Sequence, residues 1–223
     1  MKVTKRGATR GVRAVVLVLH GGQEDSKVPA TRWYPAYWRM APFAWHLGRV
    51  PHLAVWQLCN TYRGWNEPDL DPVHDARLAL DEIRRAHPDV PVALVGHSMG
   101  GRVALRVADD PAVVGICALA PWTPEGEPVA QLAGRTVLIA HGDRDNTTDP
   151  GLSYTYAERA KEVTDTVARF DVRGEAHALL WRYREWTRLV RRFTLGVLGA
   201  VELDPDIADA LAKPAPDGLR VPV

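Results

Sequence analysis

The chain alternates short, continuously apolar runs with longer segments whose apolar residues recur every three or four positions. The first pattern is typical of strands buried on both faces, and the second of helices that cover them. Strands are predicted near residues 14–20, 53–59, 91–96, 113–120, 136–141 and 168–173. Helices are predicted near residues 74–86, 99–109, 153–165 and 178–195. This alternation predicts an α/β fold, with a mostly parallel central sheet of about six strands and helices on both faces.

The length and composition suit one folded unit. With 223 residues, 46% of them hydrophobic and 25% charged, the chain can bury one sizeable core. We expect a single domain over residues 1–212 and a flexible, Pro-rich tail over residues 213–223. The formal net charge of +1 gives no reason to expect a nucleic-acid partner. The apolar run at residues 14–19 is too short for a secretion signal or a membrane span, so we expect a cytoplasmic protein, whose oligomeric state the sequence leaves open.

The most informative stretch is LVGHSMGGRVAL, residues 94–105, which holds one of only three serines in the chain. It joins a predicted buried strand to a predicted helix, so Ser98 lies on a sharp turn between them. Gly96 and Gly100 leave room for that turn, because a Cβ at either position would crowd the backbone. A G-x-S-x-G sequence in this context is typical of a nucleophile elbow, which lifts the serine hydroxyl above the edge of the sheet.

A serine hydroxyl needs a base to activate it, and the base needs an acid to orient it. Only one of the eight histidines, His177, follows residue 145, and it lies on a predicted strand-to-helix loop. The candidate acids are Asp143, Asp145 and Asp149, which share one Gly- and Asp-rich loop after a predicted strand. His97 directly precedes the serine, but alternation along the strand turns its side chain to the opposite face.

Four segments of the chain are similar to motifs of one family, the α/β-hydrolase-fold serine hydrolases. GHSMGG at residues 96–101 resembles the family's nucleophile elbow, and LHGG at residues 19–22 resembles its oxyanion loop. HGDRD at residues 141–145 resembles the acid loop, and GEAH at residues 174–177 resembles the final histidine loop. The motifs occur in the family's order. The resemblance implies a minimal form of that fold, without a large cap domain and with the opening antiparallel strands reduced or missing.

Carried over by position, the resemblance makes Ser98 the nucleophile and His177 the base. It makes Asp145 the acid, since the family's acid is the last Asp of G-x-x-D. Such a triad implies a serine hydrolase that cleaves carboxylic esters of small molecules through an acyl-enzyme. The reaction calls for no metal and no organic cofactor, and the sequence shows no metal-ligand spacing.

The resemblance also suggests which residues surround the substrate. The amides of Gly22 and Met99 form the oxyanion hole, and Gln23 is the alternative to Gly22 and a candidate substrate contact. Only thirteen residues, 123–135, separate ALAPW from TVLIAHGD, where other family members insert a cap, so we expect an open site. Trp38, in an aromatic-rich stretch after the oxyanion loop, and Trp122, at the end of its strand, are candidate walls for small or aryl esters. Most aromatic side chains of that stretch are expected to pack a helix onto the sheet.

Other functions remain compatible with these residues. The same triad serves thioesterases and acyltransferases, which differ only in the acyl acceptor and the pocket. The fold also hosts small-molecule receptors, although these usually lack part of the triad. The basic amphipathic segment at residues 178–195 fits a surface helix that covers the sheet better than a membrane-bound helix.

The two cysteines are expected to be free. In the family's sheet order, the strands of Cys59 and Cys117 lie three strand spacings apart, which is ~14 Å. That distance is too long for a disulfide. Free, buried thiols suit a cytosolic protein.

Overall fold

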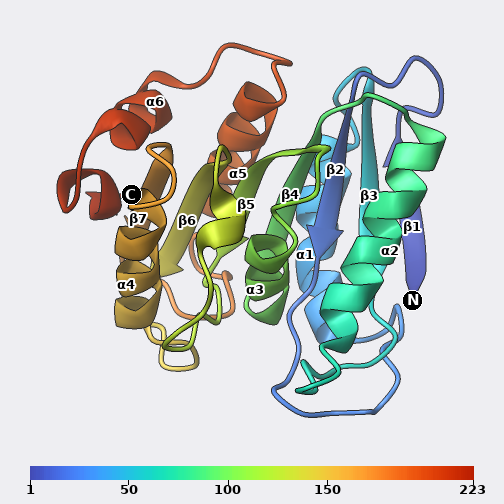
Figure 1. Cartoon of the computed structure of the whole chain (residues 1–223), viewed down its shortest axis with the longest axis horizontal. Helices are drawn as coiled ribbons and strands as arrows, with labels where there is room; N and C mark the ends of the chain where they lie inside the picture. Colours follow the sequence, from blue (N-terminus) through green and yellow to red (C-terminus); the bar gives the residue numbers. More distant parts are fainter.

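Eight strands form one sheet in the computed structural model, which describes residues 1–223. They lie in the order β1-β3-β2-β4-β5-β6-β7-β8, and every neighbouring pair is parallel except β1 with β3 (Figure 1). The strands are β1 (Lys2–Gly7), β2 (Ala14–Leu19), β3 (Leu53–Cys59), β4 (Val92–His97), β5 (Val113–Leu119), β6 (Thr136–Gly142), β7 (Val167–Val172) and β8 (Val221–Pro222).

Six helices cover the two faces of this sheet (Figure 1). The alternating pattern predicts helices on both faces, but it does not predict the helix at Pro205–Ala212. Residues of α2, α3 and α4 share an apolar cluster with one face of the strands, and residues of α1, α5 and α6 share another with the opposite face. The helices are α1 (Pro35–Leu47), α2 (Asp71–Ala86), α3 (Met99–Arg106), α4 (Pro150–Lys161), α5 (Tyr183–Val197) and α6 (Pro205–Ala212), with 3₁₀ turns at Ala130–Leu132 and Asp217–Leu219.

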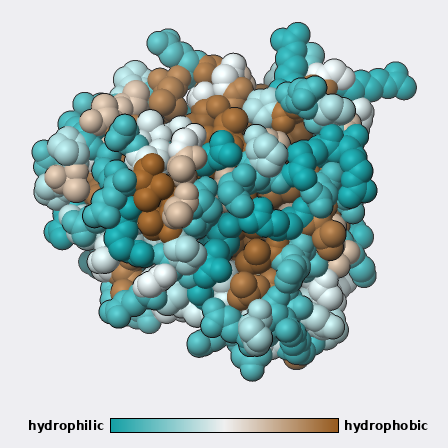
Figure 2. All heavy atoms as spheres, viewed as in Figure 1, coloured by the Kyte–Doolittle hydropathy of each residue, from teal (hydrophilic) through white to brown (hydrophobic).

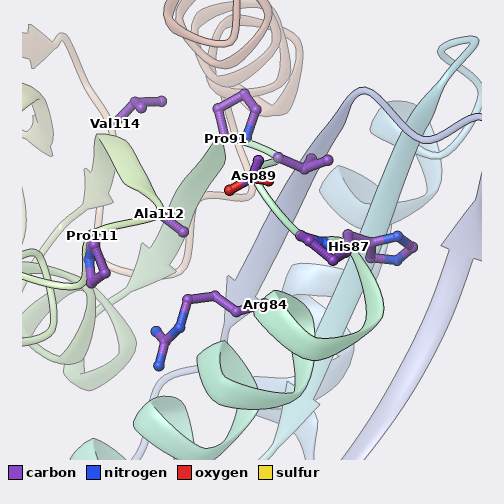
Figure 3. Close-up of a pocket in the computed structure, with 9 residues that line it drawn as sticks. Arg84, His87, Asp89, Pro91, Pro111, Ala112 and Val114 are labelled. Atoms are coloured by element: carbon purple, nitrogen blue, oxygen red, sulfur yellow. The ribbon is translucent and has the colours of Figure 1, made fainter.

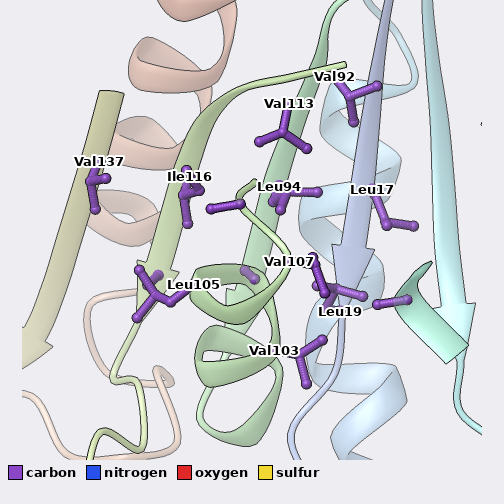
Figure 4. Packing of buried hydrophobic residues seen from close by; sticks show 14 of the residues in the cluster. Leu17, Leu19, Val92, Leu94, Val103, Leu105, Val107, Val113, Ile116 and Val137 are labelled. Atoms are coloured by element: carbon purple, nitrogen blue, oxygen red, sulfur yellow. The ribbon is translucent and has the colours of Figure 1, made fainter. Parts of the chain in front are cut away.

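The central strands are continuously apolar because helices cover both of their faces. Every residue of β2, β3 and β4 is buried. Leu17, Leu94 and Ile116 come from neighbouring strands and lie in one cluster with Val103 and Leu105 of α3 (Figure 4). Burial of these side chains holds α3 on the sheet, and with it the turn between β4 and α3.

The six predicted strands are all present, and the sheet order confirms the expected separation of the cysteines. Cys59 in β3 and Cys117 in β5 are buried free thiols, with β2 and β4 between their strands. The prediction of about six strands missed β1 and β8, which lie at the two edges of the sheet. β1 reads KVTKRG and has no apolar run, because its place is set by backbone pairing with β3 rather than by burial. β8 has only two residues.

The expected flexible tail, residues 213–223, is instead attached to the sheet. It forms a 3₁₀ turn and then β8, which pairs with β7. Leu219 in the turn has no exposed surface (0%), and its carbonyl oxygen accepts a hydrogen bond from Arg169. The prolines do not prevent this arrangement, because an edge strand needs few amide donors.

The loop before α5 also differs from the prediction, since the helix begins at Tyr183 rather than near residue 178. The buried carboxylate of Glu175 accepts hydrogen bonds from the Arg182 amide at 2.7 Å and from the Trp186 indole at 3.1 Å. Leu179 has φ 58°, a left-handed conformation that a regular helix does not contain. The segment at residues 175–182 is therefore a loop organised around Glu175.

No cap domain lies between β5 and β6, in agreement with the expected minimal form of the fold. Residues 120–135 contain only one 3₁₀ turn. The protein contains no helix with the length and hydropathy that a membrane crossing requires. The surface over α2, α3 and α4 is mostly hydrophilic, with small separate apolar patches (Figure 2).

The attachment of the tail can be tested by stability. Leu219→Ala should lower the free energy of unfolding by about 2–5 kcal/mol, because it removes a fully buried side chain. Urea denaturation followed by circular dichroism measures this change. Asp217→Asn, two residues away and exposed, is the control and should change stability little. Equal stabilities for wild type and Leu219→Ala would mean that the tail is loose.

Candidate active site

Ser98 occupies the turn between β4 and α3, where the sequence predicts it. Its backbone has φ 54° and ψ −121°, a combination that is strained for a residue with a side chain. A Cβ at Gly96 would collide with the Gly100 carbonyl, and one at Gly100 would collide with the Leu19 carbonyl. Glycines at both positions let the turn pass close to β2 while Ser98 is held at its tip.

The structure brings Ser98, His177 and Asp145 together from distant parts of the chain. The Ser98 hydroxyl donates to His177 Nε2 at 3.0 Å, and His177 Nδ1–H donates to Asp145 Oδ2 at 2.7 Å. The three residues follow β4, β7 and β6, so they meet at the carboxyl ends of parallel strands. A serine in this arrangement can pass its proton to histidine as its oxygen attacks an electrophilic carbon or phosphorus.

The Asp145 carboxylate is buried and well supplied with hydrogen-bond donors. Besides His177, it accepts from His141 Nε2 at 3.1 Å, the Thr148 hydroxyl at 2.9 Å, the Thr147 amide at 2.8 Å and the Thr148 amide at 3.0 Å. Burial by itself would raise the pKa of Asp145, but these donors outweigh it and hold that pKa well below its usual range. The carboxylate therefore stays ionised and can orient the His177 ring.

The other two candidate acids lie apart from this arrangement. Asp143 accepts a hydrogen bond from the Gly174 amide at 2.7 Å and so ties the loop after β6 to the loop after β7. Asp149 caps α4 by accepting from the Gly151 amide at 2.7 Å. Both contacts are to backbone amides, and neither carboxylate contacts a histidine.

A chain of buried side chains continues behind Asp145, and the sequence analysis missed it. His141 Nδ1 lies 2.8 Å from the Ser153 hydroxyl, and Arg169 Nε donates to the same hydroxyl at 3.1 Å. Burial is the main cause that lowers the pKa of His141, so its ring is neutral and donates to Asp145 through Nε2. The sequence feature that could have indicated this contact is the position of His141, near the end of its strand and four residues before Asp145.

His97 was also missed, because alternation alone suggests that it faces away from the site. It does project toward the α1 and α5 side, where Val95 also packs. The loop that carries His177 folds over that same side, and His97 Nε2 donates to the His177 carbonyl oxygen at 2.8 Å. The two rings lie 4.8 Å apart. Burial, followed by the neighbouring His177, lowers the pKa of His97 to about 3, so His97 is neutral.

The two predicted oxyanion donors belong to residues that pack against each other. A Cβ at Gly22 would collide with the Met99 thioether and with the Arg63 carbonyl. The Gly22 amide has no acceptor within the protein, and Met99 is the first residue of α3, so its amide has no acceptor in the helix. The Gln23 amide already donates to the Arg63 carbonyl at 2.8 Å, and its side chain is exposed. Gly22, rather than Gln23, has an amide available to a ligand.

The aromatic side chains near the site divide into packed and exposed groups. Tyr37 and Phe43 of α1 are buried, but Trp33, Trp38 and Trp45 are 84%, 52% and 49% exposed. The expectation that most aromatic side chains of this stretch pack the helix onto the sheet is therefore wrong. Trp122 donates its backbone N–H to the Ser98 carbonyl at 3.2 Å, and its ring packs partly against the core on the α3 side. Trp122 therefore lies beside the elbow, while Trp38 borders a groove between α1 and residues 178–183.

One surface hollow lies away from these residues. It has a volume of about 520 Å³, and its lining includes His87, Pro91 and Ala112 near the starts of β4 and β5 (Figure 3). Ser98 follows the opposite end of β4, so this hollow does not serve it. No group of three or more His, Cys, Asp or Glu side chains is placed to hold a metal ion.

Comparison with known protein families assigns the chain to one of them. Residues 15–223 match the sequence profile of the α/β hydrolase family. The chain belongs to the α/β hydrolase family. No curated protein sequence matches it.

Solved α/β hydrolase structures resemble this chain in fold at low sequence identity. Propionate-bound esterase 2 from Thermogutta terrifontis is 18% identical, with a TM-score of 0.69, and the match covers 91% of each chain. The monoacylglycerol lipase of Paleococcus ferrophilus is 16% identical, with a TM-score of 0.65, over 88% of this chain and 98% of the lipase. An α/β serine hydrolase homologue from Coxiella burnetii is also 16% identical, with a TM-score of 0.65, over 85% and 89% of the two chains.

The buried histidines of this α/β hydrolase predict a pH-dependent stability. Burial is the main cause that lowers the pKa values of His20, His97 and His141. In the unfolded chain these histidines take up a proton near pH 6.5, whereas in the folded protein they stay neutral to lower pH. The free energy of unfolding should therefore fall as the pH drops below about 6.5. Each ring contributes a slope of up to about 1.4 kcal/mol per pH unit.

His97→Gln isolates one of these contributions, because the carboxamide can still donate to the His177 carbonyl. Its unfolding free energy should depend less steeply on pH between 6.5 and 5 than that of the wild type, by up to about one proton. Urea denaturation at several pH values gives the slope. His74→Gln, on the exposed side of α2, is the control and should keep the wild-type slope. An unchanged slope in His97→Gln would contradict a neutral, buried His97.

Proposed function

We propose that this protein is a serine hydrolase that cleaves small or aryl carboxylic esters through an acyl-enzyme on Ser98. The observation that carries the proposal is the unbroken set of hydrogen bonds from the Ser98 hydroxyl through His177 to Asp145. The strained turn at Ser98 and the unoccupied Gly22 amide support the same chemistry.

The first half of the reaction acylates the serine. His177 Nε2 takes the Ser98 proton while Oγ attacks the ester carbonyl carbon. The amides of Gly22 and Met99 stabilise the negative charge on the tetrahedral oxygen, which is worth ~3 kcal/mol per donor. The protonated His177 then gives its proton to the departing alkoxy oxygen as the carbon–oxygen bond breaks. Asp145 stays ionised throughout and stabilises the charged ring.

The second half hydrolyses the acyl-enzyme. Water replaces the departed alcohol and loses a proton to His177 as its oxygen attacks the acyl carbon. The tetrahedral intermediate collapses, Ser98 recovers its proton from His177, and the carboxylic acid leaves. No other reactant is required.

Small substrates suit the surroundings of Ser98. No cap lies between β5 and β6, and the hollows of about 180–520 Å³ described for this surface are lined by residues other than Ser98. A short acyl chain or one aryl ring that buries ~100 Å² gains ~2.5 kcal/mol, which selects such groups but does not hold a lipid. Thioesters and acyl transfer to other acceptors use the same side chains. A receptor function is disfavoured because all three side chains are present and hydrogen-bonded.

The nucleophile can be tested directly with a fluorophosphonate probe. Ser98 should be labelled covalently, and Ser98→Ala should remove both the labelling and ester turnover, because the Ser98 hydroxyl is the one that is hydrogen-bonded to His177 Nε2, while the Ser153 hydroxyl beside His141 is fully buried. Mass spectrometry of the labelled peptide and a p-nitrophenyl acetate assay measure the two effects. Ser26→Ala, in an exposed loop, is the control and should retain both. Labelling that persists in Ser98→Ala would overturn the proposal.

Substrate range requires a separate measurement. Values of kcat/KM for p-nitrophenyl esters from acetate to palmitate should be highest for short chains, and matched thioesters show whether the oxygen ester is preferred. A maximum at long chains would contradict the small-substrate part of the proposal.

The choice of acid can be tested with paired substitutions. Asp145→Asn should lower kcat about 10³–10⁴-fold, because a neutral amide no longer fixes the productive tautomer of His177. Asp143→Asn removes the same charge two residues away and should remain close to wild type, since Asp143 contacts only the Gly174 amide. Steady-state kinetics with circular dichroism separate lost chemistry from lost fold. An active Asp145→Asn with an inactive Asp143→Asn would reverse the assignment.

A further inference from the structure

A groove begins at Ala178, the residue that follows His177 in the chain. It has a volume of about 300 Å³ and lies between α1 and the loop at residues 178–183. Phe43 and Leu179, both nearly fully buried, form its floor, while the half-exposed Trp38 and the exposed Leu180 stand at its rim. This volume is at the lower end of ligand pockets and suits a single ring with a short substituent.

One charged side chain, Arg39, lines this otherwise largely apolar groove. Arg39 is partly buried and has no hydrogen-bond or ion-pair partner in the protein. The arginines that are buried elsewhere in the molecule do have carboxylate partners: Arg102 pairs with Glu127, and Arg169 pairs with Asp171. An unpaired guanidinium in an apolar wall is a ready site for a carboxylate, which it can hold through two parallel hydrogen bonds.

The two segments that line the groove contain no carboxylate of their own. No Asp or Glu occurs between Asp25 and Glu67, a stretch that includes the whole of α1, and none occurs between Glu175 and Glu185. Both walls of the groove therefore come from segments without acidic residues. Arg39 is the one charged side chain of the lining, and its positive charge favours an anionic ligand.

The position of the groove indicates which part of an ester it receives. His177 passes its proton to the departing alkoxy oxygen, so the alcohol portion of the substrate lies on the His177 side of Ser98. Ala178, the next residue in the chain, is the first part of that loop to line the groove. The charge of Arg39 reaches this region, because it is among the causes, after burial and His177, that lower the pKa of His97.

We propose that the groove binds the alcohol portion of the substrate and that Arg39 selects alcohols or phenols that carry a carboxylate. This inference rests on the proposed ester hydrolysis at Ser98 and assigns Arg39 as a specificity-determining residue. The substrate class is an ester between a small carboxylic acid and an aryl or short alkyl alcohol that bears an anionic carboxylate.

Two matched substrates test the assignment. The first is the acetate ester of 3-(4-hydroxyphenyl)propionate, and the second is its primary amide, which has the same shape without the charge. The saturated spacer keeps the reactivity of the two phenol leaving groups alike. The quantity to compare is the ratio of kcat/KM for the carboxylate to kcat/KM for the amide. The wild type should favour the carboxylate by about tenfold, as expected for one charge-assisted contact that is partly open to solvent.

Arg39→Met should bring this ratio close to one, and Arg39→Lys should keep part of it. Leu180→Asp places a negative charge at the exposed rim of the groove and should also lower the ratio. Arg49→Met is the control, because it removes the same charge just beyond the end of α1, where Arg49 lies over the Trp45 ring. It should keep the wild-type ratio.

A wild-type ratio near one, or a ratio that Arg39→Met leaves unchanged, overturns this inference while turnover of both esters preserves the proposed function. A ratio that falls equally in Arg49→Met also overturns it, because only long-range charge would then be at work. The inference is also overturned if Arg39→Met changes the carboxylate-to-amide ratio of kcat/KM only for esters whose acyl part carries the carboxylate. Phenyl hydrogen glutarate and its amide are such a pair. Failure of the wild type to hydrolyse either ester overturns both this inference and the proposed function.

Discussion

A carboxylate withdrawn from water must be met by hydrogen-bond donors, and in this protein that requirement falls on Asp145. Its donors come from its own loop, through Thr147 and Thr148, from β6 through His141, and from the loop after β7 through His177. One buried acceptor thereby fixes the relative positions of two loops. The orientation of the His177 ring toward Ser98 follows from the same constraint.

A second buried carboxylate, that of Glu175, ties the loop that carries His177 to α5. Glu175 accepts from its neighbour Ala176, from the Arg182 amide that precedes α5, and from the Trp186 indole inside it. His177 therefore lies on a loop that is anchored to α5 on one side and to Asp145 on the other. Ser98 itself is the third fixed part of the site. Its strained turn follows the carboxyl end of β4 and is packed between β2 and α3. These contacts preorganise the site without any cap domain.

Charge is distributed unevenly around the proposed nucleophile. The acid side is rich in donors that keep Asp145 ionised, whereas the α1 side has no acidic residue and carries the unpaired Arg39. His97 lies between them as a neutral ring, because burial, followed by the neighbouring His177 and then by Arg39, lowers its pKa. The same surroundings favour a negatively charged group in the groove that begins at Ala178.

The sequence by itself determined the features that depend on local pattern: six buried strands, the helices between them, the Ser98 elbow and the order of the acid and histidine loops. These follow from continuous apolar runs and from glycines at a turn where a Cβ does not fit. Only the tertiary structure decided the edge strands β1 and β8, the attached tail around Leu219 and the start of α5. Edge strands are held by backbone pairing, which leaves no apolar pattern in the chain, and α5 begins where it does because Glu175 is satisfied by Arg182 and Trp186. The contacts of His97, His141 and Arg39 likewise join segments far apart in sequence, so no local pattern could indicate them.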